Sequence, residues 1–419
     1  MLWQIASAKK NIDWHFFETE FEKQFAIRPN MNELVQEPSE KNFIRFCELY
    51  TVGEPVTFAQ FQAKFNLIIA IMELSNLSEV TDVVQQVCHT HFQQGLQHAE
   101  YRMLFPPWIE ESLMSQLLHT ICEQLHSFEQ KTNHRFQGRL SCGLPRTDHG
   151  TIHYELLRHA MSTFPVVAQM ITSVDFCFIE EGFPPKNQRS LFQRILNDNQ
   201  KKPQQALAIL YHVGESFEDK SLESAIRWVH ESAEIGAHRL GHAIALGSPP
   251  QHYLGKTYSE SVEERLDQIA YDLSHKDGLQ AAGVQIHAEM LLTEQRQLQE
   301  KKRAEKTQKT YDSFQLDQIL LRQNYVMQYL RDHNVCIESC PTSNLCIGRI
   351  ESIEHPLHRF IEANLPVVIA SDDPGIFDTT LQQEAEWVAQ HITGSEDTLH
   401  ALAQNAKKFR SEIISGRCA

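Results

Sequence analysis

Residues 207–244, LAILYHVGESFEDKSLESAIRWVHESAEIGAHRLGHAI, contain the pattern that decides the fold. The apolar run Leu207–Leu210 has the length of a buried strand, and residues 222–235 carry apolar side chains at helical spacing. A second short apolar run begins at Arg239. A strand, a helix and a strand in this order predict two parallel strands joined by a helical crossover.

The same alternation continues along most of the chain. Helical spacing recurs between the apolar runs, for example over Glu110–Phe128. We therefore predict an α/β fold, a (β/α)8 TIM barrel, although seven strands are one short of the eight that close a barrel. Because the chain opens in a predicted helix, Leu2–Lys10, we expect the first strand to be missing. The predicted strands are Gln97–Leu104, Gly138–Gly143, Ile171–Phe178, Leu207–His212, Arg239–Ile244, Val335–Cys340 and Pro366–Ala370.

One interval is too long for a barrel. It extends from His242 to Glu338, where one helix and short loops of roughly 20–30 residues are enough. We predict a single barrel domain over residues 1–419, with a helical insertion at 248–325 between strands 6 and 7. The charged segment Glu294–Lys306 favours a solvated helical face, and the alternatives are an oligomer contact, which would make a homo-oligomer, or a lid.

The composition limits the class of protein. With 42% hydrophobic and 22% charged residues the chain is globular, and its net charge of −16 disfavours a nucleic-acid partner. The nine cysteines form no C-x-x-C pair. Together with the absence of a signal peptide, this indicates reduced thiols in a cytoplasmic protein. The apolar runs are too short for a membrane span, so no membrane partner is expected.

Three motifs follow predicted strands, at the edge where catalytic side chains of barrels gather. In the first, His212 has a ring nitrogen that can bind a metal, and Glu215, beyond Gly214, can donate a proton. In the second, His242 can orient a metal-bound water and take its proton. Each histidine taken alone is more often structural than catalytic.

The third motif is Ser371-Asp372-Asp373-Pro374. Two adjacent carboxylates after an apolar strand are costly to bury without a cation or a strong donor. A simple turn is the alternative. We expect one aspartate to bind a metal and its neighbour to bind the substrate.

These motifs, with ESCPTSN (338–344), HPL (355–357) and LPVVIASDDPGIF (365–377), resemble the adenosine deaminase family. The resemblance extends to VTFAQFQAKF (56–65) and HAEYRMLFPP (98–107), and so covers most of the chain outside the insertion. It implies a barrel of the metallo-dependent hydrolase type that holds one zinc ion. It also implies hydrolytic removal of the amino group of a purine nucleoside or a related amine.

The resemblance also implies a role for each motif residue. His212 and Asp372 would bind zinc, and Glu215 would protonate the purine ring nitrogen. His242 would hold and deprotonate the water, and Asp373 would hydrogen-bond the base. Gly214 and Phe178 would lie beside the substrate.

The sequence departs from the family in its metal ligands. The His-x-His that ends the family's first strand does not precede Leu2–Lys10. Either the chain begins at an internal Met, or it is a deaminase-like protein that has lost its metal site. In both cases we expect weak zinc binding, because two of four ligands are absent. The only literal H-x-H, at residues 89–91, is expected on an outer helix.

A second departure concerns the substrate. Phe178 stands where the family has a glycine, which leaves adenosine itself open as the substrate. The leading hypothesis is a zinc-dependent hydrolytic deaminase of adenosine or a related purine derivative. The alternatives are a catalytically inactive barrel that binds a nucleoside or a protein, and another amidohydrolase-type reaction. The nucleic-acid base deaminases are set aside because no P-C-x-x-C follows His98-Ala99-Glu100 or His287-Ala288-Glu289.

Overall fold

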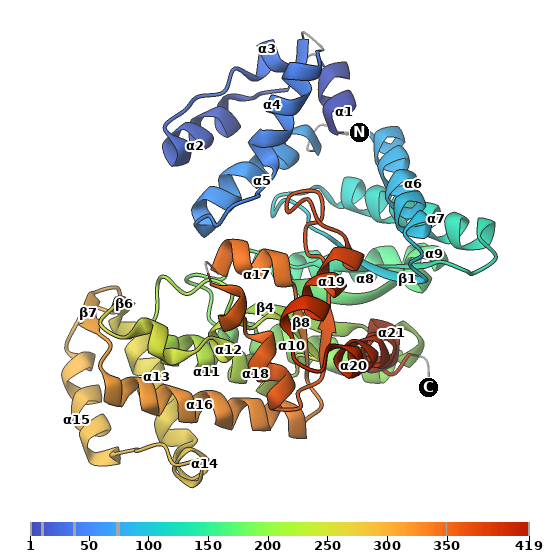
Figure 1. Ribbon diagram of the computed structural model, residues 1–419. Coiled ribbons are helices and arrows are strands. Elements are labelled where there is room, and N and C mark those ends of the chain that lie inside the picture. The colour runs from blue at the N-terminus through green and yellow to red at the C-terminus, as the bar shows by residue number, and fades with distance from the viewer. Residues whose placement is uncertain (1, 10–11, 37–38, 73–75, 349, 418–419) are drawn as a thin grey trace.

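The centre of the computed structural model, which describes residues 2–9, 12–36, 39–72, 76–348 and 350–417, is a curled parallel sheet (Figure 1). Its order is β1-β2-β3-β4-β5-β8-β9, and every neighbouring pair is parallel. The seven predicted strands and the α/β barrel fold are thereby confirmed. The strands are β1 His98–Met103, β2 Gln137–Gly143, β3 Ile171–Phe176, β4 Ala208–Val213, β5 Arg239–His242, β8 Cys336–Ser339 and β9 Val367–Ile369.

Helices connect the strands, because parallel neighbours need a crossover connection. The predicted helices at Glu110–Phe128 and Leu222–Ile235 correspond to α7 and α11. The connecting helices are α7 Glu111–Lys131, α8 His149–Thr163, α9 Pro165–Met170, α10 Arg189–Lys201, α11 Leu222–Glu234, α16 Ser313–Asp332, α17 Pro341–Gly348 and α18 Leu357–Glu362, and α19 Leu381–His391 follows the last strand. Short 3-10 turns lie at Pro185–Gln188, Pro203–Gln205, Pro250–Tyr253 and Ser352–Glu354.

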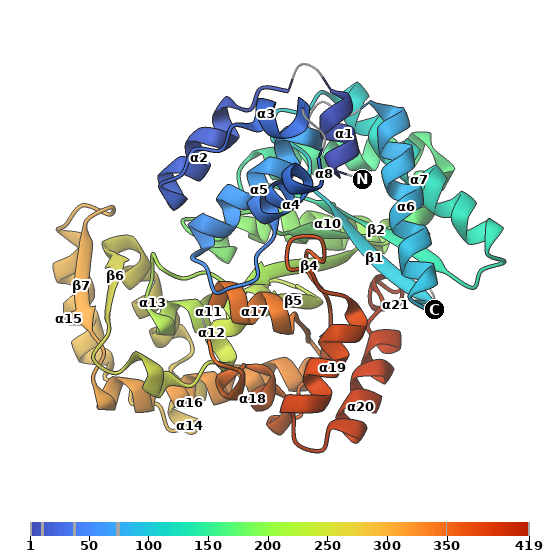
Figure 2. The same cartoon turned by 45° about the horizontal axis from the view of Figure 1, so that its top comes forward.

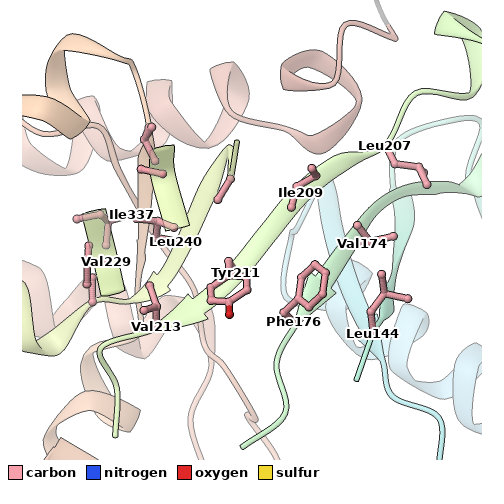
Figure 3. Packing of buried hydrophobic residues seen from close by; sticks show 14 of the residues in the cluster. Leu144, Val174, Phe176, Leu207, Ile209, Tyr211, Val213, Val229, Leu240 and Ile337 are labelled. Atoms are coloured by element: carbon pink, nitrogen blue, oxygen red, sulfur yellow. The ribbon is translucent and has the colours of Figure 1, made fainter. Parts of the chain in front are cut away.

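The main hydrophobic core lies between the sheet and these helices (Figure 3). On β4, Ile209, Tyr211 and Val213 belong to this core, where Val229 of α11 joins them. Successive strand residues point to opposite faces, so His212 lies on the other face of β4. The alternation that buries the apolar side chains against the helices therefore turns the chemically active ones inward.

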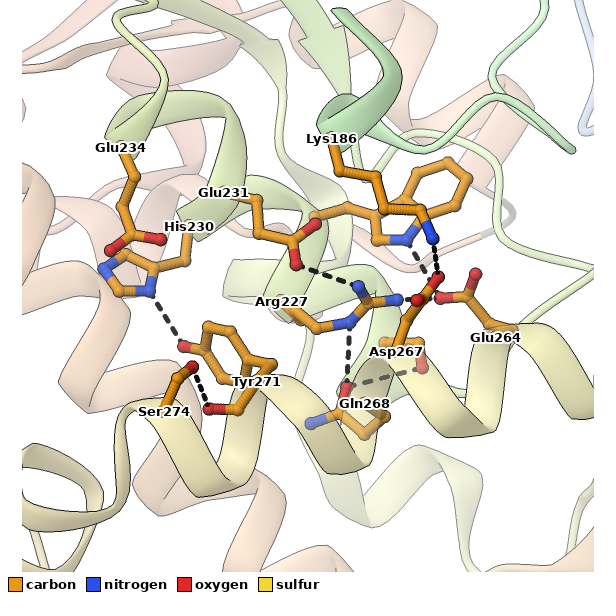
Figure 4. Close-up of polar contacts among 12 residues, drawn as sticks. Lys186, Arg227, His230, Glu231, Glu234, Glu264, Asp267, Gln268, Tyr271 and Ser274 are labelled. Atoms are coloured by element: carbon orange, nitrogen blue, oxygen red, sulfur yellow. Dashed lines mark hydrogen bonds and ion pairs between the residues drawn. The ribbon is translucent and has the colours of Figure 1, made fainter. Parts of the chain in front are cut away.

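The segment between β5 and β8 contains helices, as predicted, and also an antiparallel two-stranded ribbon of β6 and β7 that the sequence did not predict. Its helix α13 packs on α11 through Arg227, which contacts Glu264 and donates to Gln268 (Figure 4). The elements are α12 Ile244–Gly247, β6 Thr257–Ser261, α13 Val262–Ser274, α14 Lys276–Ala281, α15 Ala288–Gln299 and β7 Lys306–Thr310.

The first five helices form a group with its own hydrophobic cluster, which includes Phe17 and Phe46. In Figure 2 this group lies beside α17, and two backbone hydrogen bonds attach it there: Val52 N–H donates to Ile376 O, and Val56 N–H donates to Cys346 O. These helices therefore lie over the carboxyl ends of the strands. They are α1 Leu2–Ala8, α2 His15–Phe25, α3 Met31–Gln36, α4 Glu40–Tyr50 and α5 Phe58–Met72. Helix α6 Leu77–Gln93 instead buries Val80 and Cys88 in the main core.

The last helices, α20 Ser395–Lys408 and α21 Ser411–Ile414, cover the opposite end of the sheet. Ser411 donates from its backbone N–H and from its hydroxyl to the Glu100 carboxylate of β1. Arg239 of β5 donates to Phe409 O. In the described ranges no helix is both long and apolar enough to cross a membrane, and the eight cysteines there are free thiols.

Candidate active site

Three of the predicted residues meet at the carboxyl ends of the strands, here called the rim. His212 lies near the end of β4, His242 ends β5, and Asp372 follows β9. One metal-binding atom from each of the three lies within 4.8 Å of the others. Strand ends that are distant in sequence meet at this edge of a parallel barrel, so the motif positions bring the three residues to one edge.

The local backbone is shaped for this arrangement. Gly241 faces the His212 ring so closely that a Cβ atom on Gly241 would lie 3.0 Å from two of its ring atoms. His242 and Asp372 have φ angles of 61° and 53°, in the left-handed region. Such a conformation costs of order 1–3 kcal/mol for a side chain other than glycine. It breaks the strand alternation and turns both side chains toward His212.

Asp175, in the middle of the sheet, orients His212. Its Oδ1 lies 3.1 Å from His212 Nδ1, and Arg102 contacts its other oxygen. Burial would raise the pKa of Asp175, but His212 and Arg102 together hold it well below its usual range. The ionised carboxylate accepts a hydrogen bond from Nδ1–H of His212, which leaves Nε2 as the nitrogen able to bind a metal.

His242 lies between an amide and two carboxylates. Its Nδ1 is 2.9 Å from Asn344 Oδ1, and its Nε2 is 3.6 Å from Glu215 Oε1 and 4.0 Å from Asp372 Oδ2. Burial lowers the pKa of His242, but the charges of Glu215 and Asp372 outweigh it and raise this pKa to about 8. The ring is therefore placed to exchange a proton at Nε2.

Glu215 is held by the carboxylate of Glu180, which lies in the loop after β3. Glu180 accepts hydrogen bonds from the backbone N–H groups of Gly214, Glu215 and Ser216, at 3.0, 3.2 and 3.4 Å. Burial raises the pKa of Glu215. A carboxyl group that retains its proton more readily can act as a general acid.

The two aspartates differ in their surroundings. Ser343 Oγ donates to Asp372 Oδ2 at 2.7 Å. Burial, followed by the charge of Asp372 beside it, raises the pKa of Asp373 well above its usual value. The pair therefore combines one carboxylate that is available to a cation with one carboxyl group that is able to donate a hydrogen bond.

The other predicted residues lie around this group. Phe178 follows β3 and is half-buried, and its carbonyl oxygen accepts a hydrogen bond from Arg146. The N–H of Gly214 is engaged by Glu180. His91 lies on α6, as expected, with Nδ1 2.8 Å from Tyr101 Oη.

The donor set fits a zinc ion. It offers two imidazoles, each with its second nitrogen held by an oxygen acceptor, and one carboxylate. His212 and Asp372 supply ligands of the kinds that catalytic zinc sites use, and His242 lies beside them. The expectation from sequence counted His212 and Asp372, and the structure places His242 in the same group.

Four supporting residues were not identified from the sequence: Arg102, Asp175, Glu180 and Asn344. Asp175 carried a usable signal, since a carboxylate inside the apolar run ITSVDF is unusual. Arg102, in HAEYRM, and Asn344, in PTSN, lay inside stretches that resembled the family, although no role followed from that. Glu180 carried no signal beyond its charge.

Comparison of the sequence with known proteins finds the adenosine deaminase family model over residues 304–411. An adenosine deaminase of Shewanella loihica is 38% identical over 81 residues, which are 19% of this chain and 24% of that protein. An adenosine deaminase-like protein of Drosophila melanogaster is 50% identical over 56 residues, which are 13% of this chain and 17% of that protein. The matched segment thus spans less than a quarter of these relatives.

The solved structures match nearly the whole chain. An adenine deaminase of Arthrobacter aurescens has a TM-score of 0.56 at 16% identity, covering 99% of this chain and 95% of that one. An Arabidopsis protein complexed with IMP has a TM-score of 0.55 at 14% identity, and the match covers 97% of this chain and 89% of that one. At such identities these likenesses bear on the fold. The likeness in sequence to the adenosine deaminase family thus covers residues 304–411, and the likeness in fold covers nearly the whole chain.

Proposed function

We propose that the protein is a zinc-dependent hydrolytic deaminase of adenosine or a related purine derivative. The observation that carries this proposal is the meeting of His212, His242 and Asp372 at the rim, with Glu215 3.6 Å from His242. A metal-type donor set beside a buried carboxyl group suits the hydrolysis of an amine on a heteroaromatic ring.

The relatives and neighbours support a purine as substrate. One relative is an adenosine deaminase, and structural neighbours are an adenine deaminase and an Arabidopsis protein solved with IMP and with GMP. Another neighbour is an amidohydrolase of Burkholderia ambifaria with bound Zn, with a TM-score of 0.52. We extend purine deamination and zinc binding to this chain as part of the proposal.

Each rim residue then has a task. His212 and Asp372 would hold the zinc ion, with His242 beside them. Bound there, zinc supplies an acidified water with a pKa of about 7. Glu215 donates a proton to the purine ring nitrogen, His242 takes up the proton of the attacking water at Nε2, and Asp373 hydrogen-bonds the base.

Phe178 sets the range of substrates in this proposal. Its half-buried side chain lies in the loop after β3, and β3 pairs with β4, which carries His212. A ring at this position reshapes the pocket that an unmodified purine nucleoside would enter. Structural neighbours include an Arabidopsis N6-mAMP deaminase and a protein complexed with IMP, so we include nucleotides and N6-substituted purines among the candidate substrates.

The test is ammonia release by the zinc-loaded chain from adenine, adenosine, AMP and N6-methyl-AMP, which releases methylamine instead. We expect turnover of at least one of them, and a loss of about 10²–10⁴-fold in the Glu215→Gln variant. The control is Glu218→Gln, an exposed glutamate three residues further along the same loop, which should retain activity. The proposal is wrong if the wild-type protein is no faster than Glu215→Gln on every substrate.

A further inference from the structure

A second group of metal-type side chains lies outside the sheet, at the carboxyl end of α11. It consists of His230 and Glu234 of α11 and His275, which follows α13. One metal-binding atom from each lies within 4.8 Å of the others. His230 and Glu234 are four residues apart and so share one face of the helix. Figure 4 shows the Glu234 carboxylate beside the His230 ring.

His230 has a buried nitrogen that the protein does not satisfy. The residue is fully buried, and its Nδ1 lies 2.8 Å from Tyr271 Oη. Its Nε2 is also buried and makes no hydrogen bond to any described residue. A buried polar atom without a partner costs about 1–3 kcal/mol, so it calls for a ligand or another physical explanation.

Tyr271 orients both histidines toward Glu234. Its hydroxyl contacts His230 Nδ1, and its carbonyl oxygen lies 3.0 Å from His275 Nδ1. A carbonyl oxygen only accepts, so His275 Nδ1 carries a proton and Nε2 is the ring nitrogen that lies 2.9 Å from Glu234 Oε1. Metal-binding histidines in proteins are held in this way, with the second nitrogen bound to an oxygen.

The surroundings suit an ion that enters from one side. Tyr325 and Tyr329 of α16 pack edge-on against the His230 ring, at centroid distances of 5.5 and 4.3 Å. The His230 ring is fully buried, and its Nε2 is the ring nitrogen left for an ion. Glu234 is exposed and gives an ion access from solvent.

We propose that His230, Glu234 and His275 bind one divalent transition-metal ion of the Zn²⁺ type, which joins α11 to the end of α13. Two imidazoles and one carboxylate favour zinc or cobalt over magnesium or calcium, which prefer oxygen ligands. An ion pair between Glu234 and His275 is the metal-free alternative, but it leaves His230 Nε2 without a partner. The proposal does not depend on the function of the rim residues.

The direct test is metal stoichiometry. The full chain is treated with a chelator, the chelator is removed, and Co²⁺ is titrated with visible absorption and bound metal as readouts. We expect Glu234→Gln and His275→Gln to bind one equivalent less than wild type, or to bind it more than about 10-fold more weakly. The matched control is Glu123→Gln, since Glu123 pairs with His119 at i,i+4 and no third metal-binding group among the described residues lies within reach.

Two further variants separate this site from the rim. Tyr271→Phe keeps all three ligands but removes the hydroxyl that orients His230, and should weaken binding by about 10–100-fold. His212→Asn should leave this equivalent of Co²⁺ in place. The proposal is overturned if Glu234→Gln and His275→Gln bind Co²⁺ with the same stoichiometry and affinity as wild type. This holds whether or not the rim residues bind metal.

Discussion

Gly241 shows how a single missing side chain shapes the rim. His212 lies across the adjoining strand, and its ring is fixed from the other side by Asp175. A methyl group on Gly241 would approach the ring to 3.0 Å, which is closer than van der Waals contact allows. The ring could move only by loosening its hydrogen bond to Asp175. Gly241 and the Asp175 carboxylate therefore position His212 together.

We predict that Gly241→Ala weakens zinc binding by about 10–100-fold, as the loss of an outer partner of a ligand does. The protein should stay folded, because the displaced group is one side chain. Competition with a chelating dye measures the affinity, and thermal unfolding monitors the fold. Gly53→Ala is the control, since a Cβ atom there meets nothing within 4 Å. Equal zinc affinities in the two variants would contradict the prediction.

At the residue scale the sequence predicted the rim residues but not the residues that hold them. His212, His242 and Asp372 each end a recognisable strand, so their order along the chain was sufficient. Asp175 and Arg102 act through contacts between strands that are separated by many residues. Which side chains face each other across the barrel depends on register, and the sequence does not contain that information directly.

At the element scale most of the strands were predicted because they are buried; β1, which is half-buried throughout, is the exception. β3 and β4 are apolar runs of the length a covered parallel strand needs. The ribbon strands β6, TYSES, and β7, KTQKT, are polar; β6 is mostly half-buried and β7 is mostly exposed. They are held by pairing with each other rather than by burial, so no apolar pattern marked them.

Helix α5 links the N-terminal helices to the rim. Phe61 of α5 stacks on Phe377 with a centroid distance of 5.6 Å, and Phe377 N–H donates to Asp373 O. The two rings belong to one hydrophobic cluster, which also contains Cys346 and Ile347 of α17. Packing of α5 therefore supports the turn that carries both aspartates.

We predict that Phe61→Ala destabilises this attachment by about 3–5 kcal/mol, the usual cost of removing a buried aromatic ring. Hydrogen exchange should accelerate in residues 52–72 and in the turn after β9, because both lose the same contact. Phe16→Ala removes a ring that is 64% exposed, and should change exchange little. Unchanged exchange at residues 371–377 in Phe61→Ala would contradict the link.

At the scale of the whole molecule, buried charges connect strands across the barrel. Arg239 of β5 contacts Glu100 of β1 at 2.5 Å and Glu338 of β8 at 2.9 Å. Arg102 contacts Glu338 and Asp175. Removing one member leaves its partner charged and buried, which costs far more than the intact pair contributes. The network thus makes distant strands depend on one another.

The Glu100 carboxylate gives this network a pH dependence. Burial alone would raise its pKa, but Arg239 and the N–H of Ser411 outweigh burial and lower it from 4.5 to about 2. The pKa is lower in the folded state, so the stabilisation is complete above pH 4.5 and disappears as the pH falls through 2. The shift corresponds to about 3 kcal/mol.

We predict that Glu100→Gln lowers the free energy of unfolding at pH 7 by about 3 kcal/mol, and that the difference from wild type shrinks between pH 4.5 and 2. Urea denaturation at a series of pH values measures it. The control is Glu289→Gln, which changes an exposed glutamate on α15. Its free energy of unfolding should equal that of wild type at every pH. A difference that stays constant down to pH 2 would contradict the assignment.

The hydrogen bond from Val52 to Ile376 has a consequence for biosynthesis. A ribosome releases the N-terminal helices first, but the surface they attach to is completed only when residues 346–377 have emerged. Contacts between such distant parts of a chain form slowly, because a long loop must close. The cluster around Phe17 and Phe46 lets the early helices pack among themselves meanwhile. Their docking is then a late event, and the rim is enclosed after the strands that build it have assembled.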